Sequence, residues 1–169
     1  LKRAKELIEK GEIGDIMHAN MRWGSYLPDW HPWEDYRSFY MAKKEQGGGA
    51  LLDESHGIDL VRYIMGNAKE VFAIVDKISA LEISSDDTAF LTIRMENQTL
   101  VQINFDLTSR TPRAEFEIIG TKGTIIWDRI NARVKIFKVK NKQWKEYSYN
   151  PDKTELCYIK QAEHFFNCI

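Results

Sequence analysis

The chain is poor in cysteine and has no long apolar run. Its 169 residues include two cysteines, Cys157 and Cys168, and four prolines. Two cysteines without a Cys-x-x-Cys pair give neither a disulfide framework nor a zinc site, which favours a reducing, cytoplasmic compartment. Because no apolar stretch approaches the roughly 20 residues that cross a bilayer, no membrane partner is expected.

Neither sign of charge predominates. The 24 lysines and arginines nearly balance 25 aspartates and glutamates, which gives a formal net charge of -1. Without a basic field, a nucleic-acid partner is not expected either. The lysines between positions 135 and 145 alternate with apolar residues, a pattern typical of the solvated face of a strand.

Several motifs of catalysis and binding are missing. The four histidines, His18, His31, His56 and His164, show no His-Glu-x-x-His spacing, so no metal site is predicted. The chain has no Gly-x-Ser-x-Gly, which argues against an α/β-hydrolase. No Gly-x-Gly-x-x-Gly follows a strand, and no Lys-Ser or Lys-Thr follows the glycine triplet at 47–49, so both the dinucleotide fingerprint and the P-loop are absent.

The first third of the chain alternates between periodic and irregular segments. Residues 1–10 have the apolar spacing of a helix, and residues 13–26 alternate as a long strand does. Residues 27–46 show no period. A second helix is predicted over 50–65 and ends at Gly66.

Strands dominate the rest of the chain. They are predicted at 70–78, 88–95, 99–107, 114–119, 123–127, 133–139 and 144–149, and a final helix begins near Thr154. Their short polar connections are hairpin turns, so the pairing is mainly antiparallel. The order predicts an α+β domain with one large, mostly antiparallel open sheet and helices on one face.

The two ends of the sequence suggest that it is a piece of a longer protein. The chain begins with Leu1 rather than methionine and stops at Ile169 inside an apolar helical pattern. We therefore expect residues 1–169 to form a single domain that is a truncated piece of a longer protein.

The segment GGGALLDESHGID, residues 47–59, is the most informative part of the sequence. Asp53, His56 and Asp59 are spaced three apart, which makes them neighbours on a helix. A carboxylate beside an imidazole fixes its tautomer and raises its basicity, as a general base for an alcohol requires. The alternative is that these side chains pair only to stabilise the helix. The glycines either cradle a phosphate or, as we favour, let the backbone approach a neighbour closely.

The irregular segment before the helix is rich in aromatic and charged residues. Rings such as Tyr26 and Trp30 could stack on the apolar faces of a sugar while Asp29, Asp35 and Arg37 bond its hydroxyls. A packing loop or a subunit contact explains the same composition equally well.

The sequence GGGALLDESHGIDLVRYIMG resembles the helix that opens the C-terminal domain of the glucose–fructose oxidoreductase / inositol dehydrogenase / MocA family. The preceding YLPDWHPWEDYRSFYMAKKEQGGG resembles a branch of that family often linked to sugar or sialic-acid-like metabolism, and TKGTIIWD at 121–128 resembles one of its recurring strands. Together these resemblances cover nearly the whole chain.

This resemblance implies more than the spacing does. The family joins an N-terminal Rossmann domain, which binds NAD or NADP and supplies a lysine from a Glu-Lys-Pro motif, to a C-terminal domain built on a large open sheet. Since this sequence has no Glu-Lys-Pro, residues 1–169 would be the substrate-binding and oligomerisation domain, without the Rossmann domain and inactive alone. The implied reaction is hydride transfer on a sugar, sugar derivative or polyol, and the implied partner is a second copy bound through the sheet.

The resemblance also assigns roles to residues. His56 would exchange the proton of the substrate hydroxyl, and Asp53 would orient it. In the commoner family pattern the aspartate stands four residues before the histidine, whereas here Leu52 holds that position. Residues that would hold the substrate are Tyr26, Asp29, Trp30, Asp35, Arg37 and Asp59, and Lys44 would reach the cofactor or a substrate anion.

Two other functions stay open at this point. One is a non-catalytic sugar-binding or oligomerisation module that has kept the sheet and lost the chemistry. The other is an NAD(P)-dependent activity beyond simple oxidation, such as epimerisation or glycoside cleavage through a keto intermediate.

Overall fold

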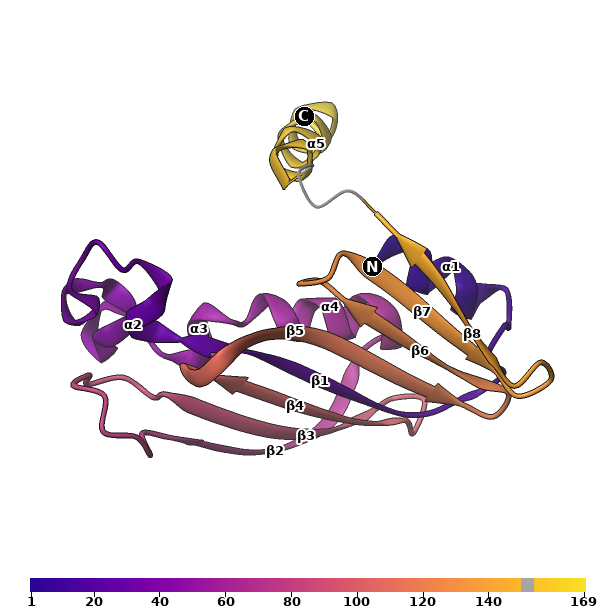
Figure 1. Ribbon diagram of the computed structural model, residues 1–169, viewed down its shortest axis with the longest axis horizontal. Coiled ribbons are helices and arrows are strands. Elements are labelled where there is room, and N and C mark those ends of the chain that lie inside the picture. The colour runs from indigo at the N-terminus through magenta and orange to yellow at the C-terminus, as the bar shows by residue number, and fades with distance from the viewer. Residues whose placement is uncertain (150–153) are drawn as a thin grey trace.

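One eight-stranded sheet forms the body of the domain (Figure 1). The computed structural model describes residues 1–149 and 154–169, and for 154–157 it describes the backbone alone. The strands are β1 (Ile16–Tyr26), β2 (Ala68–Asp76), β3 (Thr88–Met95), β4 (Leu100–Asp106), β5 (Thr108–Gly120), β6 (Gly123–Asp128), β7 (Arg133–Lys138) and β8 (Gln143–Ser148). Their order is β2-β3-β4-β1-β5-β6-β7-β8. β1 pairs in parallel with β4, and the other pairs are antiparallel, which confirms the predicted class.

β1 lies at the centre of the sheet and positions the core. Its residues alternate between the two faces, as the sequence predicts. Met21 is buried and lies opposite Ile103 of β4 and Phe116 of β5. The alternate residues Asn20 and Arg22 point to the open face of the sheet, where no helix lies (Figure 1).

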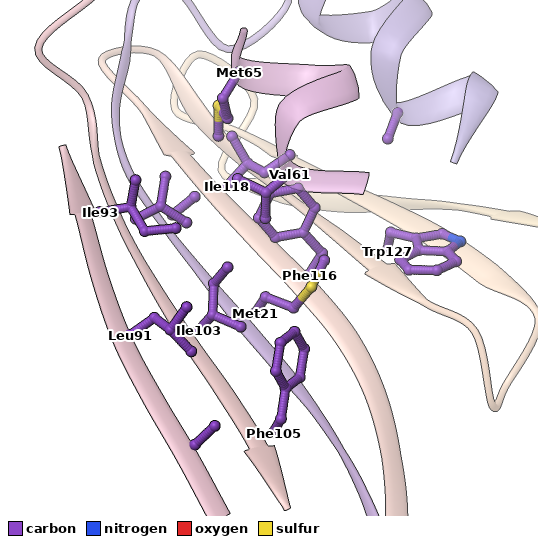
Figure 2. Packing of buried hydrophobic residues seen from close by; sticks show 14 of the residues in the cluster. Met21, Val61, Met65, Leu91, Ile93, Ile103, Phe105, Phe116, Ile118 and Trp127 are labelled. Carbon is purple, nitrogen blue, oxygen red and sulfur yellow. The ribbon is translucent and has the colours of Figure 1, made fainter. Parts of the chain in front are cut away.

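Two helices cover the other face. They are α1 (Lys2–Glu9) and α4 (His56–Met65). Val61 and Met65 of α4 pack against the buried Phe116 and its neighbours on the sheet (Figure 2). Full burial of side chains of this size stabilises the fold by roughly 1.5–3 kcal/mol each, so this contact fixes where α4 begins and ends over the sheet.

The single helix predicted over 50–65 is wrong in one respect, because the structure breaks it in two. α3 (Ala50–Asp53) ends before Glu54, and α4 begins after Ser55. At the break the amide of Gly57 donates to Glu54 O at 2.8 Å, which is an i to i−3 bond in place of the α-helical i to i−4 bond. The chain therefore tightens and changes direction between Asp53 and His56.

Gly57 explains why α4 starts with this tight turn. A Cβ on Gly57 would stand 2.6 Å from a ring atom of Phe105, so the helix start lies directly on β4. Only glycine allows so close an approach without displacing the ring.

The segment between β1 and α3 folds into short turns. It contains α2 (Leu27–Trp30) and three 3-10 turns, η1 (Tyr36–Ser38), η2 (Tyr40–Ala42) and η3 (Lys44–Gln46). No regular period was visible here in the sequence because no turn is long enough to show one.

β5 begins six residues earlier than its predicted range of 114–119, at Thr108. The register slips between the pair Gly24–Arg113 and the pair Tyr26–Thr108, so the intervening residues bulge out of the ladder. Pro112 lies in this bulge, where a residue without an amide proton costs no ladder bond.

The last helix, α5 (Thr154–Asn167), begins at the predicted position, and its described side chains are exposed. Cys168 is a free, exposed thiol, whereas the side chain of Cys157 lies outside the described residues. No helix in the described part of the chain is long and apolar enough to cross a membrane.

Candidate active site

His56 is the first residue of α4, and its side chain is 51% exposed. The ring of Trp23, from β1, meets the imidazole edge to face with centroids 4.5 Å apart. The guanidinium of Arg129, just after β6, lies 5.5 Å from the centroid of the Trp23 ring. A strand, a helix start and a turn thus hold one accessible imidazole in place.

Both nitrogens of this imidazole have a partner. Nε2 lies 3.2 Å from Oε2 of Glu54, and Nδ1 lies 3.3 Å from the backbone carbonyl oxygen of Asp53. Both partners stand in the break between α3 and α4. The two contacts therefore depend on the tight turn that separates the helices.

Glu54 is the buried carboxyl of the site. Its side chain is only 4% exposed. Burial, helped by the negative charges of Asp53 and Asp106 and opposed by Arg129, raises the pKa of Glu54 to about 7. Near neutral pH this carboxyl can hold or release a proton, a property that clusters at functional sites.

Sequence reasoning missed Glu54 as a functional residue. In a regular helix, residues two apart face different directions, so Glu54 and His56 should not meet. They meet because the helix breaks between them. The available signal was an acidic residue beside a candidate base at the start of an apolar helix.

Asp53 lies next to His56, but the expected carboxylate contact is wrong. The carboxylate of Asp53 accepts a short hydrogen bond from the hydroxyl of Tyr40, while only its backbone carbonyl reaches the imidazole. This hydrogen bond, together with burial, raises the pKa of Tyr40 to about 12. Asp53 therefore ties the η2 turn to the end of α3. Asp59 is an exposed residue of α4.

Two glycines of the triplet, Gly48 and Gly49, allow the backbone to approach a neighbour closely, whereas open space lies beside Gly47. Gly49 has φ of 122°, and a Cβ there would clash with the carboxylate of Asp86. Asp86 accepts from the amide of Ala50 through its carbonyl at 3.0 Å and from the amide of Leu51 through its carboxylate at 2.9 Å. Because these two amides after the triplet are already bonded to Asp86, they are not available to a phosphate.

The start of α3 therefore does not form a cradle for the phosphates of NAD. Lys44 of η3 is exposed, and its backbone amide donates to Ser84 Oγ at 3.0 Å. In the same ranges no three His, Cys, Asp or Glu side chains converge as metal ligands would.

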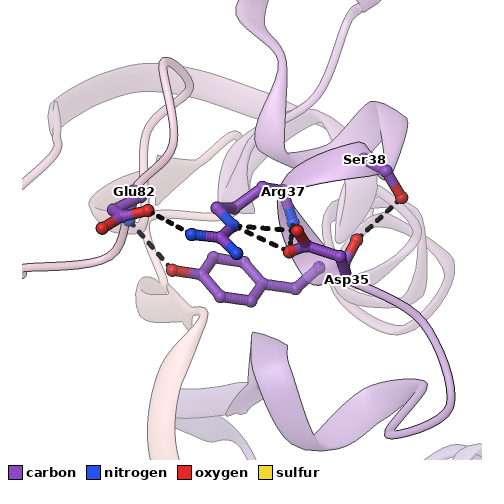
Figure 3. Close-up of polar contacts among 5 residues, drawn as sticks. Asp35, Arg37, Ser38 and Glu82 are labelled. Carbon is purple, nitrogen blue, oxygen red and sulfur yellow. Dashed lines mark hydrogen bonds and ion pairs between the residues drawn. The ribbon is translucent and has the colours of Figure 1, made fainter.

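Asp35 and Arg37, predicted to hold substrate, bind each other. Arg37 Nε lies 2.8 Å from Asp35 Oδ1, and Arg37 Nη1 lies 2.6 Å from Glu82 Oε2 (Figure 3). The hydrogen bonds to Asp35 and Glu82 raise the pKa of Arg37. The amide of Glu82 also donates to the Tyr36 hydroxyl at 3.2 Å. These residues clamp the aromatic segment to the chain before β3.

The other predicted substrate residues lie apart from this clamp. Tyr26 ends β1, and the Arg110 guanidinium stacks on its ring 3.5 Å from the centroid. Asp29 and Trp30 are exposed residues of α2. As far as the structure describes the chain, none of these three forms a hydrogen bond, ion pair or ring contact with His56.

A hollow of about 310 Å³ lies on the open face of the sheet. Its polar lining comes from Asn20, Arg22, Thr92, Gln102 and Asn104, with Phe90 at its side. Because His56 stands on the helix-covered face, this hollow is separate from the candidate active site.

Comparison with known proteins agrees with the architecture. The family model described as the GFO/IDH/MocA C-terminal domain matches residues 1–126. An uncharacterized oxidoreductase of Streptococcus pneumoniae serotype 4 is 27% identical over 136 residues, which cover 77% of this chain and 35% of that protein. A 1,5-anhydro-D-fructose reductase of Ensifer adhaerens is 24% identical over 124 residues, or 72% of this chain and 36% of that enzyme.

Levoglucosan dehydrogenase, solved in complex with NADH, has the same fold with a TM-score of 0.73. It is 23% identical and covers 88% of this chain, which in turn covers 44% of that enzyme. The chain thus spans less than half the length of these relatives. Since the family model covers most of the chain, the resemblance seen in the sequence is confirmed, and the chain belongs to the GFO/IDH/MocA oxidoreductase family, whose C-terminal domain it matches.

Proposed function

We propose that this chain is the substrate domain of an NAD(P)-dependent oxidoreductase that acts on a sugar, sugar derivative or polyol. The observation that carries the proposal is the accessible imidazole of His56, held between Trp23 and the buried carboxyl of Glu54. An imidazole in such a setting can accept the proton of an alcohol near neutral pH.

The work of this chain's residues is to bind the substrate and to move its proton. When bound, the nicotinamide supplies the acceptor for hydride. We propose that a Rossmann domain elsewhere in the whole protein holds the dinucleotide, and that Lys44 contacts it from this side. His56 takes the hydroxyl proton in oxidation and returns it in reduction, while the helix start keeps the ring at a fixed place over the sheet.

Sugar-like substrates are supported by the names of two similar proteins and by exposed rings. One relative is a 1,5-anhydro-D-fructose reductase, and one structural neighbour is a levoglucosan dehydrogenase. Trp30 and Trp33 remain exposed beside Asp29 and can stack on a sugar ring. Asp35 and Arg37 already bind each other, so we assign them first to shaping the loop and only then to contacting substrate.

The test is turnover by the intact protein. Formation of reduced nicotinamide is followed with a panel of sugars and polyols, first for the native protein and then for His56→Ala. Loss of a general acid–base group should lower kcat by roughly 10²–10⁴-fold. His164→Ala, an exposed histidine of α5, is the matched control and should keep native activity. A loss of only a few-fold in His56→Ala would remove His56 from the proton-transfer role.

A non-catalytic sugar-binding module is the competing function. It is favoured by one observation, that both nitrogens of His56 are already bonded within the domain. In that case the intact protein binds a sugar through its aromatic segment, shows no turnover with either dinucleotide, and binds equally well after His56→Ala.

We also propose that a second copy of the chain covers the open face of the sheet. Large apolar side chains are exposed there, among them Phe72 and Ile74 of β2 and Phe90 of β3. Ile74 and Phe90 are paired across the two strands, and Phe90 borders the polar hollow. An apolar patch beside a polar one is typical of a subunit interface.

A further inference from the structure

We propose that Glu54 and His56 form a carboxylate–imidazole pair that takes up and releases one proton, with Glu54 as the positioning residue for the imidazole. The inference deepens the proposed function and rests on it for the identity of the proton, which is the one on the substrate hydroxyl. The contact between the buried Glu54 carboxyl and the His56 ring does not depend on the proposed function.

The hydrogen-bond partners of the His56 ring indicate how many protons the Glu54–His56 pair holds. A backbone carbonyl oxygen can only accept, so Nδ1 carries a hydrogen when it bonds the carbonyl of Asp53. Nε2 then faces the carboxyl of Glu54 at 3.2 Å. One further proton must lie between them, either on Nε2 or on the carboxyl, because two unprotonated acceptors at this distance repel. The geometry therefore fits the pair in its one-proton state.

When that proton leaves, the pair is in its empty state, which has one proton fewer. The ionised Glu54 then keeps Nε2–H as a donor, and the lone pair of the ring moves to Nδ1, where it faces the carbonyl of Asp53 and is poorly satisfied. A substrate hydroxyl that takes the place of the Asp53 carbonyl at Nδ1 relieves this mismatch. Its O–H bond breaks, the electron pair stays on the substrate oxygen, and the proton forms the Nδ1–H bond, which restores the one-proton state.

The charged and buried surroundings of Glu54 set the pH at which the pair takes up its proton. Asp53 at the end of α3 and Asp106 at the end of β4 contribute negative charge, and Arg129 after β6 contributes positive charge. Trp23 of β1 covers the imidazole without adding a charge. Burial of the Glu54 carboxyl, the largest effect, raises its pKa to about 7, so the pair exchanges its proton near neutrality.

Neither aspartate on the predicted helix can take the place of Glu54. The carboxylate of Asp53 is bonded to the Tyr40 hydroxyl. Asp59 is exposed and forms no ion pair with His56 within the ranges that the structure describes. Glu54 alone combines near-complete burial with contact to the ring.

The experiment is an NMR titration of the 169-residue chain that follows the ring resonances of His56 and the carboxyl carbon of Glu54. In the native chain the Glu54 carboxyl should titrate near pH 7, and the signals of the His56 ring should respond to that change. The rings of His18 and His164 serve as internal references. A carboxyl that titrates in the ordinary glutamate range, independently of the ring, overturns the proposal without any variant.

Variants then test which carboxylate acts on the ring. Glu54→Gln should change the pH dependence of the His56 signals, since the negative charge beside the ring is gone. Asp59→Asn should leave them unchanged. If Asp59→Asn moves them and Glu54→Gln does not, the assignment of the carboxylate is wrong. Should Glu54→Gln fail to fold, the native titration alone decides.

The same pair should be visible in kinetics. In the intact enzyme, Glu54→Gln should shift the pH profile of kcat/KM, whereas a merely structural role would lower its height at every pH. A coupled titration in the 169-residue chain, combined with an intact protein that shows no turnover, would retain the pair and reject the proposed function. An active enzyme with uncoupled titrations would reject only the pair.

Discussion

The ionisation of Glu54 links the stability of the domain to pH. An unfolded chain exposes this carboxyl to water with an ordinary pKa, whereas burial in the folded chain raises the pKa of Glu54 to about 7. The folded state therefore binds the proton more tightly. The stabilisation is fully present below the unfolded pKa of 4.5 and is lost as the pH rises through about 7.

We predict that the free energy of unfolding falls between about pH 5 and about pH 8, by no more than roughly 3 kcal/mol from this group. Glu54→Gln removes the titration, so its stability should vary less over the same range. Urea unfolding of both proteins at several pH values measures the difference. Parallel pH dependences in the two proteins would show that Glu54 ionises normally in the folded state.

Residue types alone pointed to one member of the candidate site. His56 could be placed from its spacing to two aspartates and from the family resemblance, and its position at the start of α4 agrees with that. The partner could not be placed, because Glu54 reaches the ring only through a helix break that local pattern does not encode. At that break Gly57 lies against Phe105, which is far away in the sequence.

At the scale of elements, the turn before α3 depends on two different glycines. Gly49 has φ of 122° and ψ of 160°, a region open essentially to glycine alone, and it faces the carboxylate of Asp86. Gly47 has φ of 78° in the left-handed region, but open space lies where its Cβ would stand.

We predict unequal costs for the same substitution at the two positions. Gly47→Ala should lower stability by about 1 kcal/mol, from backbone conformation only. Gly49→Ala should cost more than about 2 kcal/mol, because the steric clash with Asp86 adds to the backbone strain. Chemical denaturation of both variants gives the comparison. Equal losses would mean that the close approach to Asp86 does not constrain the turn.

The strands were easier to predict than the helices. β3 was predicted at its observed limits, since alternation and turn residues define both ends. β5 was predicted too short because Pro112 suggests a boundary, and the bulge that accommodates it depends on the neighbouring β1. The aromatic segment gave no period because its turns are short, and its ion-pair clamp to Glu82 joins residues that are distant in sequence.

At the scale of the whole molecule, the open face of the sheet presents apolar side chains that a solitary domain would not need. Phe72 is 68% exposed and Phe90 is 52% exposed. Val71, which is also on β2 but points to the other face, is 63% exposed.

This arrangement supplies a matched pair of variants for the proposed assembly. Phe72→Lys should weaken self-association by placing a charge in the interface, whereas Val71→Lys should leave it nearly unchanged. Sedimentation of the intact protein at several concentrations distinguishes them. Equal association in native protein and Phe72→Lys would place the interface elsewhere.

The central claim is that this chain carries the substrate and proton side of an oxidoreductase whose dinucleotide is held elsewhere in the whole protein. The most direct measurement is NAD and NADP binding by calorimetry, made side by side on the intact protein and on residues 1–169. The account predicts that the intact protein binds one of the dinucleotides and that the 169-residue chain binds neither. Equal binding by the short chain, or no binding by the intact protein, would contradict it.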